Sequence, residues 1–290
     1  MKSTSLSNWG RWGKDDQRGA LNLLTPEVIR NALGLVKEGR LYNLSVETGP
    51  NGPAPAHRNQ TWHVCRVYHD LGRPGRDVGE DFISMHVHTG THLDALGHVW
   101  YDHQLYNGYS DSSISLIDGA RKNSVENVKG IVGRGVMLDV PAYKGLPELP
   151  LGYAITPADL EGCASRQGVA FRPGDILLVR TGFLKEFVKD RSLYDKGIPG
   201  VGESCIEWLH RHDVVALGVD NPAVECRPSE TPGGALRLHE VMLRDLGAYL
   251  IEYAWLEELA RDKVYEFLFV AAPLQIKNGA SSPMNPLAIV

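Results

Sequence analysis

Residues 86–103 read HVHTGTHLDALGHVWYDH, and the interpretation of the whole sequence begins from this stretch. Five of the 11 histidines lie within it, together with a carboxylate at Asp94. Side-chain packing alone rarely gathers so many imidazoles, whereas a metal site requires imidazole nitrogens and carboxylate oxygens that converge on one point. The stretch therefore predicts a metal site.

The spacing within the stretch allows three side chains to meet. His88 ends an expected strand, and Gly90 permits a sharp turn that other residues resist. This turn can return the chain so that His92 lies beside His88. In an extended segment His92 and Asp94 face the same side, because they are two residues apart. Two imidazoles and one carboxylate leave coordination positions open, which is the pattern of a catalytic metal site rather than a structural one.

The segments on both sides of this stretch alternate between strand and helix patterns. The later strand patterns are continuous apolar runs, which suit strands covered on both faces. Such alternation predicts an α/β fold, with some antiparallel pairing in the first half. The strand patterns occupy residues 61–68, 83–88, 135–140, 176–180, 214–219 and 264–271, and the helical patterns occupy residues 25–37, 156–166, 202–212 and 240–246.

No shift in composition marks a boundary between domains. Residues 1–24 mix Trp, Gly and charged residues, so we expect an irregular N-terminal arm there and a single domain over residues 25–290. The chain has 290 residues, of which 43% are hydrophobic and 22% charged. This composition is typical of a globular protein and excludes disorder, collagen and coiled coil.

Charge and hydropathy exclude several kinds of partner. The net charge is −5 and the sequence has no basic stripe, so we expect no nucleic acid to bind. No apolar run approaches the ~18 residues that suggest a membrane span, and the N-terminus lacks the apolar core of a secretory signal. The four cysteines are far apart and form no C-x-x-C pair, which favours buried free thiols in a cytoplasmic protein.

Residues 88–98, HTGTHLDALGH, resemble the H-x-G-T-H-x-D-x-P-x-H motif of the cyclase-like metal hydrolases. That family includes bacterial kynurenine formamidase, isatin hydrolase and trans-dienelactone hydrolase. Leu96 stands where the family usually has Pro, at a position that is not a ligand. Residues 12–26 resemble the longer members, isatin hydrolase and dienelactone hydrolase, more than the formamidases. Further similar segments extend the resemblance over nearly the whole chain.

The resemblance implies a mixed, barrel-like β-sheet flanked by helices, in a homodimer or homotetramer. It implies that His88, His92 and Asp94 bind a divalent metal ion, and that Asp94 can bridge two ions. It also implies that His98 transfers protons beside the metal. Zinc and manganese both suit two histidines and a carboxylate, so we expect one or two ions of either kind.

A second pair of residues could enlarge the metal site. His239 and Glu252 resemble the pair that completes a second metal position in binuclear members of the family. The alternative is that His239 lies on a helix surface and that Glu252 lies at a strand end, with no role in metal binding.

Aromatic residues near the motif are candidates for the wall of a substrate pocket. Trp100 and Tyr101 closely follow His98, and Trp62 lies in a neighbouring strand pattern. They could line a pocket for a flat small molecule. They could equally belong to the core, where most aromatic side chains lie.

Metal-dependent hydrolysis is the activity that these residues favour. A bound metal ion activates water and polarises a carbonyl, and a histidine such as His98 can carry a proton to the leaving atom at neutral pH. The sequence motifs of serine hydrolases, nucleotide-binding proteins and the common zinc peptidases are absent. We therefore expect a small-molecule substrate, namely an isatin-like cyclic amide or a dienelactone-like lactone whose ring is opened.

Three alternatives remain open. An arylformamidase that acts on N-formylkynurenine would share every step except the shape of the substrate. A non-haem iron oxygenase can also use two histidines and one carboxylate. A non-catalytic metal-binding protein would have no need of His98.

Overall fold

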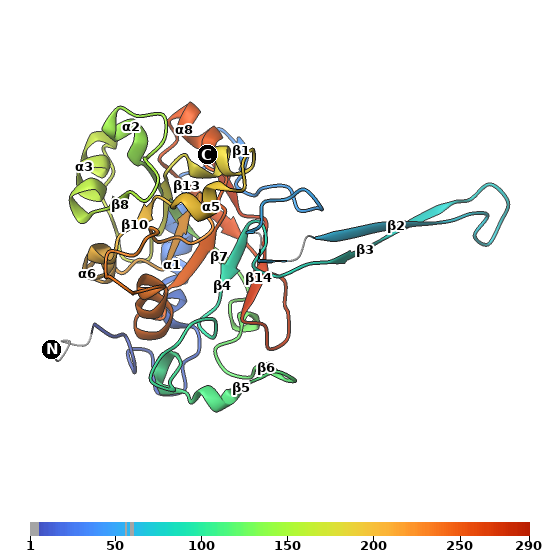
Figure 1. The fold of residues 1–290 in the computed structure, drawn as a ribbon, viewed down its shortest axis with the longest axis horizontal. Helices are drawn as coiled ribbons and strands as arrows, with labels where there is room; N and C mark the ends of the chain where they lie inside the picture. Colours follow the sequence, from blue (N-terminus) through green and yellow to red (C-terminus); the bar gives the residue numbers. More distant parts are fainter. Residues whose placement is uncertain (1–5, 56, 59–60) are drawn as a thin grey trace.

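The computed structural model describes residues 6–55, 57–58 and 61–290, and its body is built around one curled, mixed sheet (Figure 1). The neighbouring pairs β7–β9, β9–β11 and β11–β12 are parallel, and the other pairs in this sheet are antiparallel. This confirms the predicted α/β fold with a mixed, barrel-like sheet, which here is curled into a half-barrel. The nine strands, in spatial order, are β1 (Leu41–Asn43), β15 (Leu287–Ile289), β13 (Glu266–Ala271), β7 (Ile131–Asp139), β9 (Ile176–Arg180), β11 (Ala216–Val219), β12 (Tyr249–Glu252), β4 (His92–Asp94) and β14 (Ser281–Pro283).

Short helices and turns surround this sheet. The α-helices are α1 (Pro26–Leu33), α2 (Val140–Lys144), α3 (Pro157–Gln167), α4 (Phe183–Phe187), α5 (Leu193–Lys196), α6 (Ile206–Arg211), α7 (Arg237–His239) and α8 (Glu257–Asp262). The 3₁₀-helices are η1 (Gly19–Leu23), η2 (Tyr106–Gly108), η3 (Asp111–Ser113), η4 (Val125–Asn127) and η5 (Glu203–Cys205), and η6 (Glu240–Asp245) is a π-helix that directly follows α7. In the part of the chain that the structure describes, no helix is long and apolar enough to span a membrane.

The parallel strands at the centre of the sheet form the core. Every residue of β9 and β11 is buried, as their continuous apolar runs predicted. The ends of these two strands are tied together by the buried carboxylate of Asp220. It accepts hydrogen bonds from the backbone N–H of Thr181 at 2.6 Å and from that of Gly182 at 2.8 Å. These bonds hold the start of the loop that follows β11 beside the start of the loop that follows β9.

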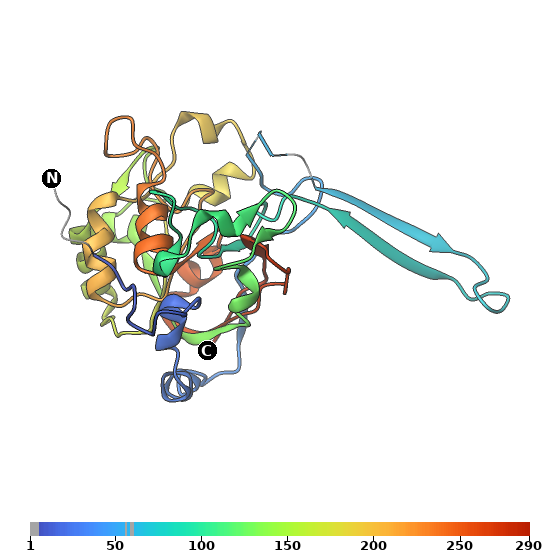
Figure 2. The same cartoon turned by 90° about the horizontal axis from the view of Figure 1, so that it is seen from below.

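Three pairs of short strands lie outside the main sheet: β2 (Trp62–Tyr68) with β3 (Val78–Ser84), β5 (Ile114–Ser115) with β6 (Gly119–Ala120), and β8 (Ala154–Ile155) with β10 (Gly200–Val201). The β2–β3 pair, residues 62–84, extends away from the body in both views (Figures 1 and 2), and we call it the projecting hairpin. Among the described residues, its two strands pair only with each other.

Several predicted elements differ from those observed. The helix expected over residues 25–37 begins as predicted, with Thr25 as its N-cap, but ends at Leu33 because the chain leaves the helix at Gly34. The strand expected over residues 83–88 is wrong. β3 ends at Ser84, because the hairpin register ends there and the chain turns toward the body.

The expectation of buried cysteines is wrong for Cys65. This thiol is exposed on β2, whereas the other three cysteines are buried, and all four are free. The strand pattern of residues 61–68 predicted β2 correctly but could not show that the strand is exposed among the residues that the structure describes.

The N-terminal segment packs on the body. The indole N–H of Trp9 donates to the carbonyl of Arg244 at 2.6 Å, and the side-chain amide of Asn8 donates to the carbonyl of Leu246 at 3.0 Å. The phenol of Tyr106 donates to Asp16 at 3.0 Å. This segment therefore supports η6 and the turn that contains Tyr106.

Candidate metal centre

The antiparallel pairing of β4 with β12 brings distant acidic and imidazole groups together. In this register Glu252 lies directly opposite His92, and Leu250 lies opposite Asp94. Side chains directly opposite each other on neighbouring strands have Cβ atoms about 4.5–5.5 Å apart. His92 Nε2 accordingly lies 3.3 Å from Glu252 Oε2 and 3.5 Å from Asp94 Oδ1. All three residues are buried.

The turns on either side of β4 bring two more histidines to Asp94. Gly90 adopts a positive φ of 64°, so the predicted sharp turn between His88 and His92 is present. His88 Nε2 lies 3.5 Å from Asp94 Oδ1 and 3.2 Å from His98 Nδ1. His98 Nε2 lies 3.9 Å from the same carboxylate oxygen. One oxygen of Asp94 is therefore surrounded by three imidazoles.

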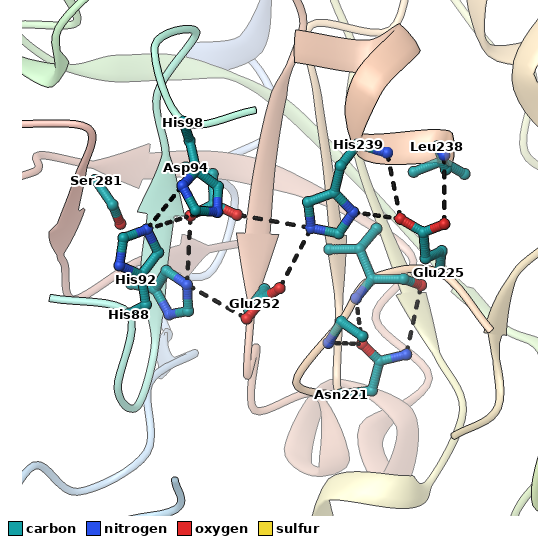
Figure 3. A network of polar contacts seen from close by, with 12 residues as sticks. His88, His92, Asp94, His98, Asn221, Glu225, Leu238, His239, Glu252 and Ser281 are labelled. Carbon is teal, nitrogen blue, oxygen red and sulfur yellow. Dashed lines mark hydrogen bonds and ion pairs between the residues drawn. The ribbon is translucent and has the colours of Figure 1, made fainter. Parts of the chain in front are cut away.

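The other oxygen of Asp94 faces a histidine from a distant part of the chain. His239, at the end of α7, places its Nε2 3.9 Å from Asp94 Oδ2 and 3.5 Å from Glu252 Oε1. Figure 3 shows Asp94 between His88, His92 and His98 on one side and His239 on the other, with Glu252 between His92 and His239. The six residues His88, His92, Asp94, His98, His239 and Glu252 thus lie in one cluster, and we call this cluster the metal centre.

The ring orientation of two buried histidines is set by their second nitrogen. His92 Nδ1 lies 2.8 Å from the carbonyl of Gly90, so this nitrogen carries the proton that is donated to that oxygen. His239 Nδ1 hydrogen-bonds to Glu225 Oε1. In both cases Nε2 faces the carboxylates. Metal-binding histidines are commonly oriented in this way, by donation of the other ring N–H to a carbonyl or a carboxylate.

Glu225 is the residue of this site that the sequence did not reveal. It is buried on the loop after β11 and accepts the backbone N–H groups of Leu238 and His239, both at 3.3 Å. Asn221 shapes that loop by accepting the N–H of Ala223 at 3.0 Å. No spacing rule connects a glutamate in a loop with a histidine 14 residues later, so only the folded chain could identify this contact.

Within the described ranges, four buried polar atoms of the metal centre have no hydrogen-bond partner. They are His92 Nε2, both carboxylate oxygens of Asp94, and Glu252 Oε2. Buried polar groups are nearly always paired, because an unpaired one costs about 1–3 kcal/mol, and more when it is charged. The ligand atoms of His92, Asp94 and Glu252 lie within 4.8 Å of one another, as do those of His88, Asp94 and His98. A divalent cation would satisfy these groups.

Burial and neighbouring charges shift the pKa values of several side chains in the metal centre. Burial opposes ionisation of Asp94, but the surrounding histidines, His98 foremost, hold the pKa of its carboxyl well below the usual value. Burial lowers the pKa of His88 to about 3. Burial would also lower the pKa of His239, but Glu225 and Glu252 outweigh it and raise the pKa to about 10. A cation that bound through His239 would have to displace a proton there, so its affinity would fall as the pH falls.

A cavity of about 500 Å³ gives access to the metal centre. The centre contributes His98, His239 and Glu252 to its wall, and Arg58 and Tyr194 also line it. A volume of this size is within the range of about 300–1,000 Å³ that is typical of small-molecule sites.

The three aromatic residues expected at the pocket lie elsewhere in this chain. Trp62 is 61% exposed on the projecting hairpin. Tyr101 donates to Asp245 at 2.7 Å and stacks under the guanidinium of Arg244, beside a separate cavity of about 550 Å³. Trp100 is half-buried beside it. Among the described residues that line the cavity at the metal centre, none of these three appears.

Comparisons with known proteins agree with this architecture. The sequence profile of the Cyclase family, described as "Putative cyclase", matches residues 42–226. The crystal structure of a protein described as a novel cyclase superposes with a TM-score of 0.92 at 37% identity, covering 98% of this chain and 97% of that chain.

More distant structures share the fold. Isatin hydrolase A from Ralstonia solanacearum has a TM-score of 0.64 at 22% identity, over 91% of this chain and 98% of its own. A "predicted metal-dependent hydrolase" from Bacillus stearothermophilus has a TM-score of 0.57 at 20% identity, over 86% of this chain and 97% of its own. A comparison with curated proteins found no match.

We expect Glu225→Gln to weaken binding of a divalent cation about 10- to 100-fold, the usual effect of removing a carboxylate that orients a ligand histidine. The amide can donate to His239 Nδ1 and so direct the proton to Nε2, which would block coordination. Titration with Zn²⁺ or Mn²⁺ in a calorimeter measures the change. Glu240→Gln is the control, because Glu240 pairs with Arg237 at 3.0 Å, outside the metal centre. Equal cation affinity in wild type and Glu225→Gln would contradict the orienting role.

Proposed function

Because this chain belongs to the cyclase family, we propose that it is a metal-dependent hydrolase that opens a small cyclic amide or lactone. The observation that carries the proposal is the buried set of unpaired ligand atoms on His92, Asp94 and Glu252, at a centre that borders an accessible cavity. The name of the related Bacillus stearothermophilus structure, a metal-dependent hydrolase, supports the same reaction class.

His88, His92 and Asp94 would hold the first ion, as the motif implied, and His239 and Glu252 would complete a second position. Oδ1 of Asp94 faces His88 and His92, and Oδ2 faces His239, which would suit a carboxylate shared by two ions. Glu252 lies against both His92 and His239. Imidazole and carboxylate together suit Zn²⁺ and Mn²⁺. When bound, such an ion supplies Lewis acidity, which polarises a carbonyl and makes water a stronger acid.

His98 is the proposed proton carrier. It lies at the rim of the metal centre, lines the cavity, and contacts His88 at 3.2 Å through Nδ1. From this place it can take a proton from the attacking water and return it to the leaving nitrogen or oxygen. Because its Nε2 is also 3.9 Å from Asp94, a ligand role is the alternative that must be tested.

The ring-opening substrate is favoured over the open-chain formamide by two features. Residues 12–26 resemble the longer, ring-opening members of the family, and isatin hydrolases are among the structures that share the fold. Since Trp62, Trp100 and Tyr101 do not line the cavity, Tyr194 and Leu236 would supply the apolar wall for the ring. An arylformamidase that acts on N-formylkynurenine is the second candidate.

The other classes fit the centre less well. A non-haem iron oxygenase uses two histidines and one carboxylate and leaves the remaining positions open. Here four histidines and two carboxylates surround the site. A non-catalytic metal-binding protein would have no need of a cavity beside its ligands.

We expect His98→Ala to keep its metal but to lose about 100-fold or more in kcat, the usual contribution of a general acid–base residue. Elemental analysis and steady-state kinetics on the same samples separate the two effects. His103→Ala is the matched control, because His103 is exposed and pairs with Asp111 on the surface at 2.9 Å. Loss of the metal from His98→Ala would make His98 a ligand and would refute its role as proton carrier.

We expect the metal-loaded enzyme to prefer a cyclic substrate when isatin, a dienelactone and N-formylkynurenine are compared. The ratio kcat/KM is the proper measure, because it reports relative stabilisation of the transition states. A clear preference for N-formylkynurenine would replace the ring-opening proposal with the arylformamidase. Failure to hydrolyse a broad panel of esters and amides would refute hydrolysis itself.

A further inference from the structure

The wall of the cavity at the metal centre carries two arginines, Arg58 and Arg227. Elsewhere in the chain a shielded guanidinium meets a carboxylate, as Arg134 does with Asp175 at 2.9 Å. Among the described residues, no carboxylate forms an ion pair with either arginine of the cavity. Two positive charges that the described part of the chain does not pair therefore border the place where a substrate would bind.

The acidic residues of the same wall are already engaged. Glu225 and Glu252 are buried and lie on the two sides of His239, whose Nδ1 hydrogen-bonds to Glu225 and whose Nε2 lies 3.5 Å from Glu252 Oε1. A divalent cation at the metal centre would add further positive charge beside them. The loaded cavity would then be positive, although the chain has a net charge of −5. A cleft lined by charges of one sign concentrates ligands of the opposite sign.

Arg227 is held in place by its backbone and by an aromatic ring. Its N–H donates to the carbonyl of Ile198 at 2.8 Å, and its own carbonyl accepts the N–H of Ile198 at 2.8 Å. Its guanidinium carbon lies 4.6 Å from the ring centre of Tyr194, which lines the same cavity. Such stacking covers one face of a guanidinium and leaves the N–H groups at its edge available. Arg227 is therefore oriented before any ligand binds.

Arg58 differs from Arg227 in how its donors are used. Its guanidinium donates to the carbonyl of His88, which places this positive charge beside the metal centre. Among the described residues, the structure shows no hydrogen bond from the guanidinium of Arg227. Arg58 thus adds positive charge to the cavity while it supports the metal centre, whereas Arg227 keeps its donors for a ligand.

We propose that the substrate is an anion, namely a cyclic amide or lactone that carries a carboxylate apart from the carbonyl that is attacked, and that Arg227 binds this carboxylate. The inference rests on the proposed function and narrows its substrate class. The edge of a guanidinium matches the two oxygens of a carboxylate through parallel N–H···O bonds. Binding of a group remote from the reacting bond positions the carbonyl at the metal centre.

The test compares isatins and phthalides that carry a carboxylate, at each free position of the benzene ring, with the matched carboxamides. The two members of each pair are similar in size and differ in charge. The ratio kcat/KM is measured for each pair on metal-loaded wild type, Arg227→Gln, Arg227→Lys and Arg261→Gln. Arg261→Gln is the control, because Arg261 is exposed, pairs with Asp262 at 2.8 Å and does not line the cavity.

We expect wild type to prefer at least one carboxylate over its carboxamide by about 10- to 100-fold, the usual range for hydrogen bonds to a charged group, chiefly through a lower KM. Arg227→Gln should lose this preference. Arg227→Lys should keep part of it, because the charge remains without the fork of donors. Arg261→Gln should keep all of it. In wild type the preference should shrink as the salt concentration rises.

Equal kcat/KM within every pair in wild type overturns the proposal. A preference that survives in Arg227→Gln also overturns it, because the metal ion itself would then bind the carboxylate. Weaker product inhibition in Arg227→Gln, without a preference among substrates, assigns the arginine to the carboxylate that ring opening creates and overturns the proposal as well.

Failure of the proposed function is distinguished by binding. If none of these compounds is hydrolysed, the same pairs are titrated into the metal-loaded chain in a calorimeter. Tighter binding of a carboxylate that depends on Arg227 would support the anion site and count against hydrolysis of these rings alone. Equal binding of carboxylate and carboxamide would refute the anion site.

Discussion

The carboxylate of Asp94 is the group on which the rest of the site depends. It is fully buried on β4, and neither of its oxygens has a hydrogen-bond partner. A buried carboxylate that has no hydrogen-bond donor or positive charge beside it costs free energy. The fold must therefore place such groups around it. The turn at Gly90 and the end of α7 deliver imidazoles to it, and the register of β4 with β12 adds the second carboxylate of Glu252. A divalent cation would complete this compensation and would at the same time provide the proposed chemistry at the cavity.

Local patterns in the sequence predicted a large part of this arrangement. The apolar runs predicted the buried parallel strands, because a strand that is covered on both faces has no alternation of apolar and polar residues. The motif of residues 88–98 predicted that His88, His92 and Asp94 would meet, because a glycine turn and a spacing of two suffice for this. β4 itself was missed as a strand, because His-Leu-Asp has the composition of a site rather than of a sheet.

Contacts between distant segments could not be predicted from local patterns. Glu225 lies in the loop that follows β11, and only the folded path of that loop brings its carboxylate to His239. The strand pattern of residues 61–68 was correct, but pattern alone could not show that β2 leaves the body. Trp62 was therefore a candidate for the pocket wall, but it lies exposed on the projecting hairpin. Periodicity predicts which side chains share a face of a strand, whereas the partners of that strand depend on the fold of the whole chain.

The most direct test of this account is the metal content of the purified chain after incubation with Zn²⁺ or Mn²⁺ and removal of the excess. Elemental analysis should find one or two ions per chain in wild type. Asp94→Asn keeps the size of the side chain but removes its charge, so it should retain less than about a tenth of the metal. Equal metal content in the two proteins, or a wild type that retains no divalent ion, would contradict the claim that the buried carboxylate is built to hold a cation.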